Sequence, residues 1–422
     1  MKCRRWRIAN EFPAPVEPHS QKIELRSKAG GFGVRYCFIM MTIEETIDGM
    51  ATSTQKNWLE LAHELGRDFA TRAAEHDEDD SFVSENYDAL KRHNFFGAMV
   101  PKEFGGGGVS HSEMCGILRT LAQYCSATAL AHSMHQHLVA TTLWKFNHGQ
   151  GGEPMLRNVA AGQPVLVSTG ANDWLESSGE AIRVEGGYRV TAKKSFASQS
   201  AVGDVLVTSA PFNDAEKGWQ VLHFPVPIKS EGVTVLNDWR TLGMRATGSH
   251  SVKLTGVFVP EASVYLRRPR GVFHPVFNVV IAVAMPLVTS VYTGIAQKAA
   301  QMTIEAAKKQ RQRKPYLAGA IGAMMNELTS AELHLQDMIR ITNDLDFQPL
   351  NEVGQEMMSR KTNCANACIG VVTRAMEIVG GQGFYRSFGL ERLFRDVQAA
   401  KYHPLPPADQ QLSLGEHILG AD

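Results

Sequence analysis

The sequence predicts an α+β protein, mainly α-helical, with an N-terminal helical domain, a central small β-barrel or sandwich and a C-terminal four-helix bundle. Two observations lead to this order. Apolar residues recur at three- and four-residue spacing before residue 163 and after residue 262, as on the buried faces of helices. Between these stretches, short β-branched runs alternate with turn residues, as in small all-β domains. We therefore expect a flexible leader at 1–50 and domains at 51–163, 164–262 and 263–422.

The N-terminal domain is assigned from its apolar period. Trp58, Leu61 and Leu65 follow one helical face, and further helices are expected at 84–93 and within 112–147.

The central domain contains seven short runs that predict strands. Gly186 and Gly187 stand between the second and third runs, where a hairpin needs a tight turn. The runs are 165–169, 181–184, 188–192, 205–210, 221–226, 233–236 and 250–259.

Three long helices are expected in the C-terminal domain, at 275–312, 316–343 and 351–380, because these stretches are rich in Ala, Met and Val. Pro286 should bend the first of them, since proline has no amide hydrogen to donate. Two shorter helices should follow.

The charge balance argues against several classes of partner. The 422 residues carry 43 Lys and Arg against 43 Asp and Glu, so no general attraction to nucleic acid or to an anionic membrane is expected. Residues 1–40 hold eight basic and three acidic side chains, and they lack the core of a signal peptide. No apolar run approaches the ~20 residues of a membrane span. We expect a cytoplasmic protein whose six cysteines are reduced and bind no metal.

Two glycine clusters do not predict a phosphate loop. Gly105–Gly108 is followed by Val-Ser-His where a P-loop needs Gly-Lys-Ser/Thr, and a helix precedes Gly380–Gly383 where a dinucleotide fold needs a strand. Both read as turns at helix ends.

Four motifs carry a resemblance to a known family. They are Val100-Pro-Lys-Glu-Phe-Gly-Gly-Gly-Gly108, Gly187-Tyr-Arg-Val-Thr-Ala-Lys-Lys-Ser-Phe-Ala-Ser198, Leu242-Gly-Met-Arg-Ala-Thr-Gly-Ser-His250 continuing to Val257-Phe-Val-Pro260, and the block from Ala375 to Asp396. In this order they resemble the acyl-CoA dehydrogenase superfamily of flavoproteins, over about residues 57–420.

The resemblance implies FAD, bound between the central domain and the C-terminal helices. Ser168 and Ser198 match positions that hydrogen-bond the isoalloxazine ring, and Phe196 matches one that stacks near it. Gln382 and Gly383 match the turn that approaches the adenine end of a neighbouring subunit's FAD, which implies a homodimer or homotetramer.

The pyrophosphate-binding arginine of the family falls near Arg311. The usual Arg-x-x-Phe-Gly context is replaced here by Arg311-Gln-Arg-Lys-Pro315, so Arg313 is an equal candidate.

The sequence departs from the family where dehydrogenation needs a base. Most members carry a Glu a few residues after an Arg-Asp pair, and counting from Arg395-Asp396 places Pro404 there. A second branch has its Glu on the first C-terminal helix, where Asn278 aligns. The loop Thr169-Gly-Ala-Asn-Asp-Trp174 also replaces the motif that helps to hold a thioester.

Histidines are the alternative proton carriers, because their unperturbed pKa of ~6.5 suits transfer near neutrality. His403 lies beside the lost Glu position, and His132, His135 and His137 cluster on one expected helix. The flavin monooxygenase branch of the superfamily resembles this arrangement. We take His403, His135 and His137 as catalytic candidates, while core histidines remain the alternative for the helix.

Three functions follow from the resemblance. The first is an FAD-dependent dehydrogenase that oxidises the α,β bond of an acyl-CoA thioester with a non-standard base and passes electrons to an electron-transfer flavoprotein. The second is a two-component monooxygenase that receives reduced flavin, FMN in that case, from a flavin reductase and uses a C4a-hydroperoxide. The third is a non-catalytic flavin-binding protein. A small-molecule substrate is expected for either enzyme.

Overall fold

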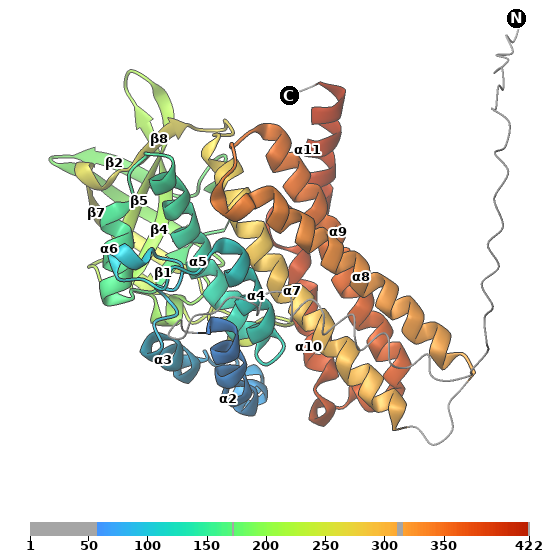
Figure 1. Ribbon diagram of the computed structural model, residues 1–422. Coiled ribbons are helices and arrows are strands. Elements are labelled where there is room, and N and C mark those ends of the chain that lie inside the picture. Colours follow the sequence, from blue (N-terminus) through green and yellow to red (C-terminus); the bar gives the residue numbers. More distant parts are fainter. Residues whose placement is uncertain (1–56, 171–172, 310–314, 421–422) are drawn as a thin grey trace, which may run out of the picture. The chain divides into compact units, whose positions relative to one another are not determined.

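The computed structural model describes residues 57–170, 173–309 and 315–420. A helical part, a sheet and a second helical part follow one another, which confirms the predicted fold class (Figure 1). The leader at 1–50 lies outside the described residues.

The N-terminal helices begin at caps that the sequence supplies. Asn57 accepts a hydrogen bond from the Glu60 amide at the start of α2, and Ser110 and Glu113 form a capping box at the start of α4. The helices are α2 (Trp58–Glu78), α3 (Ser84–Arg92), α4 (His111–Ala122), α5 (Ser126–Asn147) and α6 (Glu153–Gly162).

The eight strands of the described residues form a sheet in the order β6-β7-β3-β2-β4-β5-β8, with β1 parallel to β4. The two halves of this order meet at a single pair, Ala181 and Phe212, between β2 and β4. The strands are β1 (Leu166–Ser168), β2 (Glu180–Val184), β3 (Gly187–Lys194), β4 (Val205–Asp214), β5 (Gly218–Pro227), β6 (Val233–Val235), β7 (Val252–Pro260) and β8 (Leu266–Pro269).

Seven strands lie at the expected runs, and β8 lies beyond the expected boundary at residue 262. It reads Leu-Arg-Arg-Pro and has no β-branched residue, so propensity gives it no signal. Its pairing with β5 at the edge of the sheet forms it.

The C-terminal helices are α7 (Val276–Lys308), α8 (Leu317–Thr342), α9 (Asn351–Val379), α10 (Leu390–Val397) and α11 (Pro407–Leu419). α7 packs against α4 and α5 as well as against α8 and α9, so it joins the two helical parts (Figure 1).

Position explains the apolar character of α7. Among the described helices it is the one long and apolar enough to cross a membrane by length and composition, yet 94% of its most apolar window is buried inside the protein. We expected no stretch of this kind. A helix surrounded by protein is apolar on every side, as a membrane helix is.

Pro286 stands inside α7, and neighbouring helices satisfy the carbonyls around it. Pro286 cannot donate to the carbonyl of Ala282, one turn earlier. The Thr342 hydroxyl, at the end of α8, donates to that oxygen at 2.9 Å, and Nε2 of His111 on α4 contacts the next carbonyl, that of Val283, at 2.8 Å. α7 therefore remains continuous through the proline.

We predict that Thr342→Val lowers the free energy of unfolding by about 1–2 kcal/mol, because the buried Ala282 carbonyl loses its donor. Urea denaturation measures the change. In a Pro286→Ala background the loss should shrink, since residue 286 then supplies an amide hydrogen to the same oxygen. Thr329→Val, on the exposed face of α8, is the matched control. An equal loss with and without Pro286 contradicts this account.

Candidate functional site

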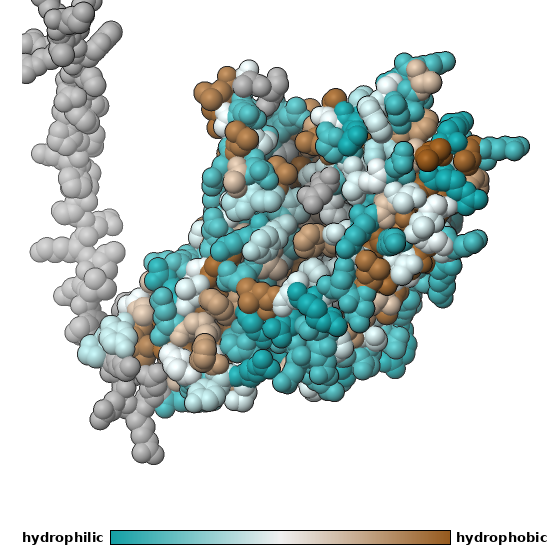
Figure 2. Space-filling model, turned by 180° about the vertical axis from the view of Figure 1, so that it is seen from behind, coloured by the Kyte–Doolittle hydropathy of each residue, from teal (hydrophilic) through white to brown (hydrophobic). Residues whose placement is uncertain are grey.

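A cavity of about 510 Å³ lies where α5, α7, α10 and the loops of the sheet meet. Its volume is in the range of cofactor and substrate pockets. Apolar side chains of α5 and α7, such as Met134, Val280 and Val288, form one part of the wall. The loops of the sheet, Arg395 of α10 and the stretch after α10 form the rest. Seen from behind, the molecule is hollowed, with hydrophobic surface along the hollow (Figure 2).

Hydroxyl groups form the polar part of the wall. Ser168 ends β1, and Ser198 follows β3. The Ser249 hydroxyl donates to Oγ of Ser198 at 2.8 Å, and the hydroxyls of Ser249 and Thr247 lie 2.7 Å apart. Such a row can accept or donate hydrogen bonds at the edge of a planar heterocycle.

Two aromatic rings stand at the mouth of the cavity. Phe196 and Trp239 meet edge to face, with ring centroids 6.0 Å apart, and the Trp239 indole donates to the Met244 carbonyl. Phe196 is 56% exposed and has a φ of 57°, while Met244 has a φ of 54°. Positive φ values are costly for bulky residues and cluster at ligand sites.

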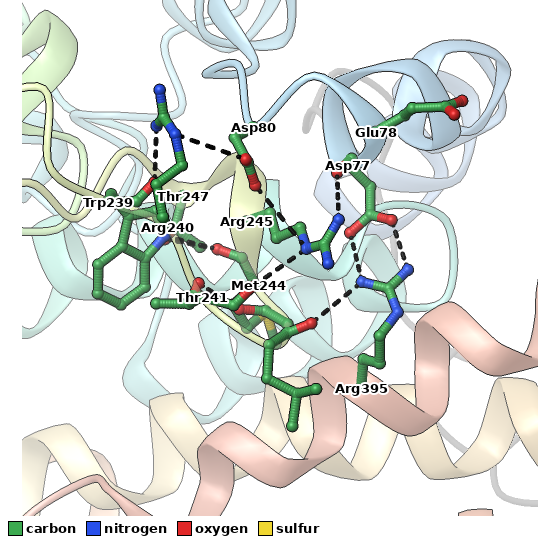
Figure 3. A network of polar contacts seen from close by, with 12 residues as sticks. Asp77, Glu78, Asp80, Trp239, Arg240, Thr241, Met244, Arg245, Thr247 and Arg395 are labelled. Carbon is green, nitrogen blue, oxygen red and sulfur yellow. Dashed lines mark hydrogen bonds and ion pairs between the residues drawn. The ribbon is translucent and has the colours of Figure 1, made fainter.

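The loop 238–244 is held to α2 and α10 by the network in Figure 3. Arg395 forms a two-point ion pair with Asp77, at 3.0 and 2.5 Å, and donates to the carbonyl of Leu242. Arg240 and Arg245 both approach Asp80, at the end of α2. The guanidinium of Arg395 is thereby directed to Asp77 at the edge of the cavity.

The neighbouring carboxylate, Asp396, is buried and joins three parts of the chain. It accepts hydrogen bonds from the Met244 amide at 2.6 Å and from the Ser126 hydroxyl at the start of α5. Burial raises its pKa. Gly243 permits this contact, because a Cβ there would lie 2.3 Å from the Arg395 carbonyl oxygen.

His403 lines the cavity, and two buried residues of the bundle fix it. The hydroxyl of Tyr292 on α7 lies 2.5 Å from its Nε2, and Lys361 on α9 donates to its carbonyl at 2.7 Å. Lys361 also holds the Leu405 carbonyl. Burial lowers the pKa of His403 to about 3, aided by the charges of Lys361 and His137, and burial lowers the pKa of Lys361 to about 8. His403 is thus neutral near pH 7, and its ring lines the cavity.

The structure separates the histidines of α5. His137 lines the cavity, and its buried Nδ1 makes no hydrogen bond of good geometry, although the Ser133 carbonyl lies near enough to oppose part of the burial effect. Burial lowers its pKa to about 4. His135 faces the other way. Its Nδ1 accepts from the Leu166 amide and its Nε2 donates to the Phe96 carbonyl, so both ring nitrogens are used in the core.

His132 also faces the core, where Gln136 contacts its Nε2 at 3.0 Å. Of the three catalytic candidates, the cavity therefore brings together His403 and His137 and leaves out His135.

The expected flavin-binding residues are placed as follows. Ser168, Phe196 and Ser198 lie together in the cavity wall. Gln382 and Gly383 lie in a short 3₁₀ helix, Gly380–Phe384, outside that wall. Arg311 and Arg313 lie outside the described residues.

The structure also describes the two positions at which the resemblance implies a Glu. Pro404 lines the cavity, while Asn278 is buried and donates to the Pro349 carbonyl and to Asn351. Among the described residues that line the cavity, none is Asp or Glu. Nor do the described residues contain a cluster of three metal-ligating side chains.

Sequence reasoning missed Tyr292 and Lys361. Lys361 carried a usable signal, because a lysine among Met, Thr and Cys on a buried helix face needs a partner. Tyr292 lies in an apolar run, and only the fold shows that its hydroxyl meets His403.

Two family models match the chain. The acyl-CoA dehydrogenase N-terminal domain matches residues 52–163, and the acyl-CoA dehydrogenase C-terminal domain matches residues 287–405. The matches cover more than half of the sequence. The chain belongs to the acyl-CoA dehydrogenase superfamily, and the broad expectation of a flavin-dependent oxidoreductase is supported.

Individual relatives carry several different names. The putative acyl-CoA dehydrogenase YdbM of Bacillus subtilis is 25% identical (83% of this chain, 93% of that protein), and the amino sugar nitrososynthase RubN8 of Streptomyces rubradiris is 26% identical (83% and 86%). The probable FMNH2-dependent monooxygenase SfnC of Pseudomonas putida is 24% identical (86% and 94%). The solved structure of KijD3 with FMN and a dTDP-linked amino sugar has a TM-score of 0.80 at 24% identity (89% and 96%), and shows the shared fold.

We predict that acid destabilises this protein through its buried histidines. The folded-state pKa of His135 and His137 is about 4, and that of His403 and His223 about 3. Below the unfolded pKa of about 6.5 the unfolded chain takes up protons that the folded protein does not, so stability falls as the pH decreases.

The variant that tests this prediction is His135→Gln, which removes one buried histidine that does not line the cavity. It should reduce the slope of unfolding free energy against pH by about 1 kcal/mol per pH unit between pH 6 and 5, with no change of slope above pH 7.5. Urea denaturation at each pH measures this. An unchanged slope argues against a neutral, buried His135.

Proposed function

We propose that this protein is the oxygenase of a two-component flavin-dependent monooxygenase, which takes reduced FMN from a separate reductase and oxygenates a small molecule. The observation that carries the proposal is the chemistry of the cavity wall. His403 and His137 line it in neutral form, and none of its described residues is a carboxylate.

The wall lacks the base that thioester dehydrogenation requires. A general base is most effective when its pKa lies near the working pH, whereas the pKa of His403 is about 3 and that of His137 about 4. Pro404 offers no proton acceptor at the position of the missing Glu. Abstraction of an α-proton is therefore poorly supported by these residues.

The same wall suits oxygen chemistry. A reduced flavin supplies the two electrons with which molecular oxygen places one atom in a substrate and releases the other as water. Neutral His403, positioned by Tyr292, can hydrogen-bond to a reacting oxygen through its ring, and the apolar residues of α5 and α7 line the same cavity.

The residues present fit a flavin ring. The hydroxyl row offers partners along one edge of the cavity, and Phe196 offers a ring beside it. These contacts serve FMN and FAD alike. We propose FMN because KijD3 was solved with FMN and SfnC is described as FMNH2-dependent.

Self-association is part of the proposal. Phe384 and Tyr385, beside Gln382, are 81% and 69% exposed, as residues covered by another copy in a homodimer or homotetramer would be. Light scattering during gel filtration measures the mass.

The two enzyme functions can be separated by electron flow. When protein loaded with reduced FMN is mixed with oxygen, we expect the oxidised flavin spectrum to return in two phases. A site closed to solvent should slow the loss of hydrogen peroxide and so separate the reaction with oxygen from the return of oxidised flavin. In anaerobic solution, acyl-CoA esters of any chain length should leave the oxidised flavin unbleached. Bleaching by a thioester refutes the monooxygenase proposal in favour of the dehydrogenase.

His403→Ala should lower oxygenation at least about 100-fold, in the range that one positioned hydrogen-bonding group contributes to a reaction, while FMN still binds. Oxygen consumed should instead appear as hydrogen peroxide, since the electrons have no productive path. Product formation and peroxide are measured together. His417→Ala, on α11 outside the cavity wall, is the control; equal activity of the two variants removes His403 from the reaction.

Reduced FMN should bind more tightly than reduced FAD in anaerobic titrations. Ser198→Ala should weaken both equally, because its hydroxyl contacts the ring system that they share. Tighter binding of reduced FAD would show that the cofactor is FAD, and the proposed flavin-binding residues of the cavity would stay the same.

A further inference from the structure

A smaller cavity of about 130 Å³ opens beside the main one and shares part of its wall, including His137, Ser168 and Trp174. We call it the side chamber and define it by Thr141, Lys145, Ser209, His223, Tyr265 and Phe277. It lies between α5, the sheet and the first turn of α7. A molecule in the main cavity can therefore reach into it.

Lys145 brings an uncompensated charge to the side chamber. The residue is partly buried, and burial lowers the pKa of its ammonium group. Its contact with the described residues is with the face of the Tyr265 ring, whose centroid lies 5.3 Å from Nζ. No carboxylate of the described residues forms an ion pair with it, so its three donors can serve a ligand.

A second cation stands behind His223. Arg268 is 1% exposed and donates to Nε2 of His223 at 3.1 Å and to the carbonyl of Asp173 at 2.9 Å. These acceptors are neutral, so they do not cancel the guanidinium charge. Burial and the charges of Arg268, His274, Lys145 and Lys194 lower the pKa of His223 to about 3.

The acid in the wall is already paired. Asp173 forms a buried ion pair with Lys194 at 2.8 Å, and it also accepts hydrogen bonds from the Thr169 hydroxyl and the Ser178 amide. Asp173 and Lys194 therefore balance each other. The charges of Lys145 and Arg268 remain in excess, and a buried excess charge favours an anionic ligand.

The size of the side chamber limits what enters. A closed cavity of about 150 Å³ just holds benzene, so 130 Å³ suits an acid group better than a second ring. The adjoining main cavity is largely apolar and takes the remainder of the molecule.

We infer that the substrate is a small molecule with an anionic oxygen-containing group, a carboxylate, sulfonate or phosphonate, which the side chamber binds with Lys145 as its counter-charge. The inference deepens the proposed function by naming the substrate class. Lys145 is a residue that selects and positions the substrate, because it lines the side chamber and not the main cavity that His403 lines.

The test measures equilibrium binding to the FMN-loaded protein by calorimetry. The probes share one ring: phenylacetate, phenylmethanesulfonate and benzylphosphonate carry an acid group, and phenylacetamide is the neutral counterpart. We expect the best acid to bind at least about tenfold more tightly than the amide, as expected for a charged hydrogen bond. The ranking of the three acids identifies the anion.

Variants assign the preference to the side chamber. Lys145→Met should abolish the preference for acid over amide and leave the affinity for phenylacetamide within about twofold, while Lys145→Arg should keep it. Lys253→Met, which removes an exposed lysine from β7, should change nothing. Equal binding of acid and amide to the unmodified protein, including no binding of either, overturns the inference, as does a preference that survives Lys145→Met.

This result is independent of the proposed reaction. Binding is measured without oxygen or turnover, so a protein that fails the oxygenation tests can still show the Lys145-dependent preference. A working oxygenase without that preference leaves the proposed function intact and removes the inference alone.

Discussion

The buried carboxylate of Asp396 is the contact on which the cavity depends. Asp396 accepts hydrogen bonds from the Met244 amide, in a loop of the sheet, and from the Ser126 hydroxyl of α5. The adjacent Arg395 forms an ion pair with Asp77 on α2. A buried carboxyl group is stable only when it is hydrogen-bonded, and here each donor comes from a different part of the chain. Loss of either donor would leave a buried polar group without its partner, so the hydrogen bonds favour one arrangement of these parts.

Burial determines the charge state of the histidines that line the cavity. Histidine normally titrates near neutrality, yet burial lowers the pKa of His403 and of His137, because an imidazolium would lose its hydration. The charge of Lys361 lowers the pKa of His403 further. Lys361 thus has two effects on His403. Its hydrogen bonds fix the backbone of the loop, and its charge opposes protonation of the ring.

Much of the fold follows from local patterns. Seven strands and the long helices are visible in the periodicity, because burial on one face imposes a repeat of 2 or 3.6 residues. β8 is not visible in this periodicity, because it is an edge strand that forms by pairing with β5 and needs no apolar alternation. The apolar α7 resembles a membrane helix in sequence, and only its neighbours identify it as a core helix.

Part of the candidate site could be predicted from the sequence. Ser168, Phe196, Ser198 and His403, which the sequence motifs single out, line one cavity. Helical spacing places His135 and His137 on opposite faces of α5, but both faces are buried, so the sequence does not tell which face meets the cavity. Side-chain pairs far apart in sequence, such as Tyr292 with His403, have no sequence pattern at all.

The order of the chain adds a consequence for synthesis. Asp396 and His403 follow every other element of the cavity, so during translation the loop that contains Met244 emerges long before the carboxylate that receives its amide. Before α10 is made, the Met244 amide has no Asp396 carboxylate to receive it, and the cavity lacks the wall that Arg395 and the residues after it provide. A flavin held in this cavity would meet a complete wall only once α10 has docked.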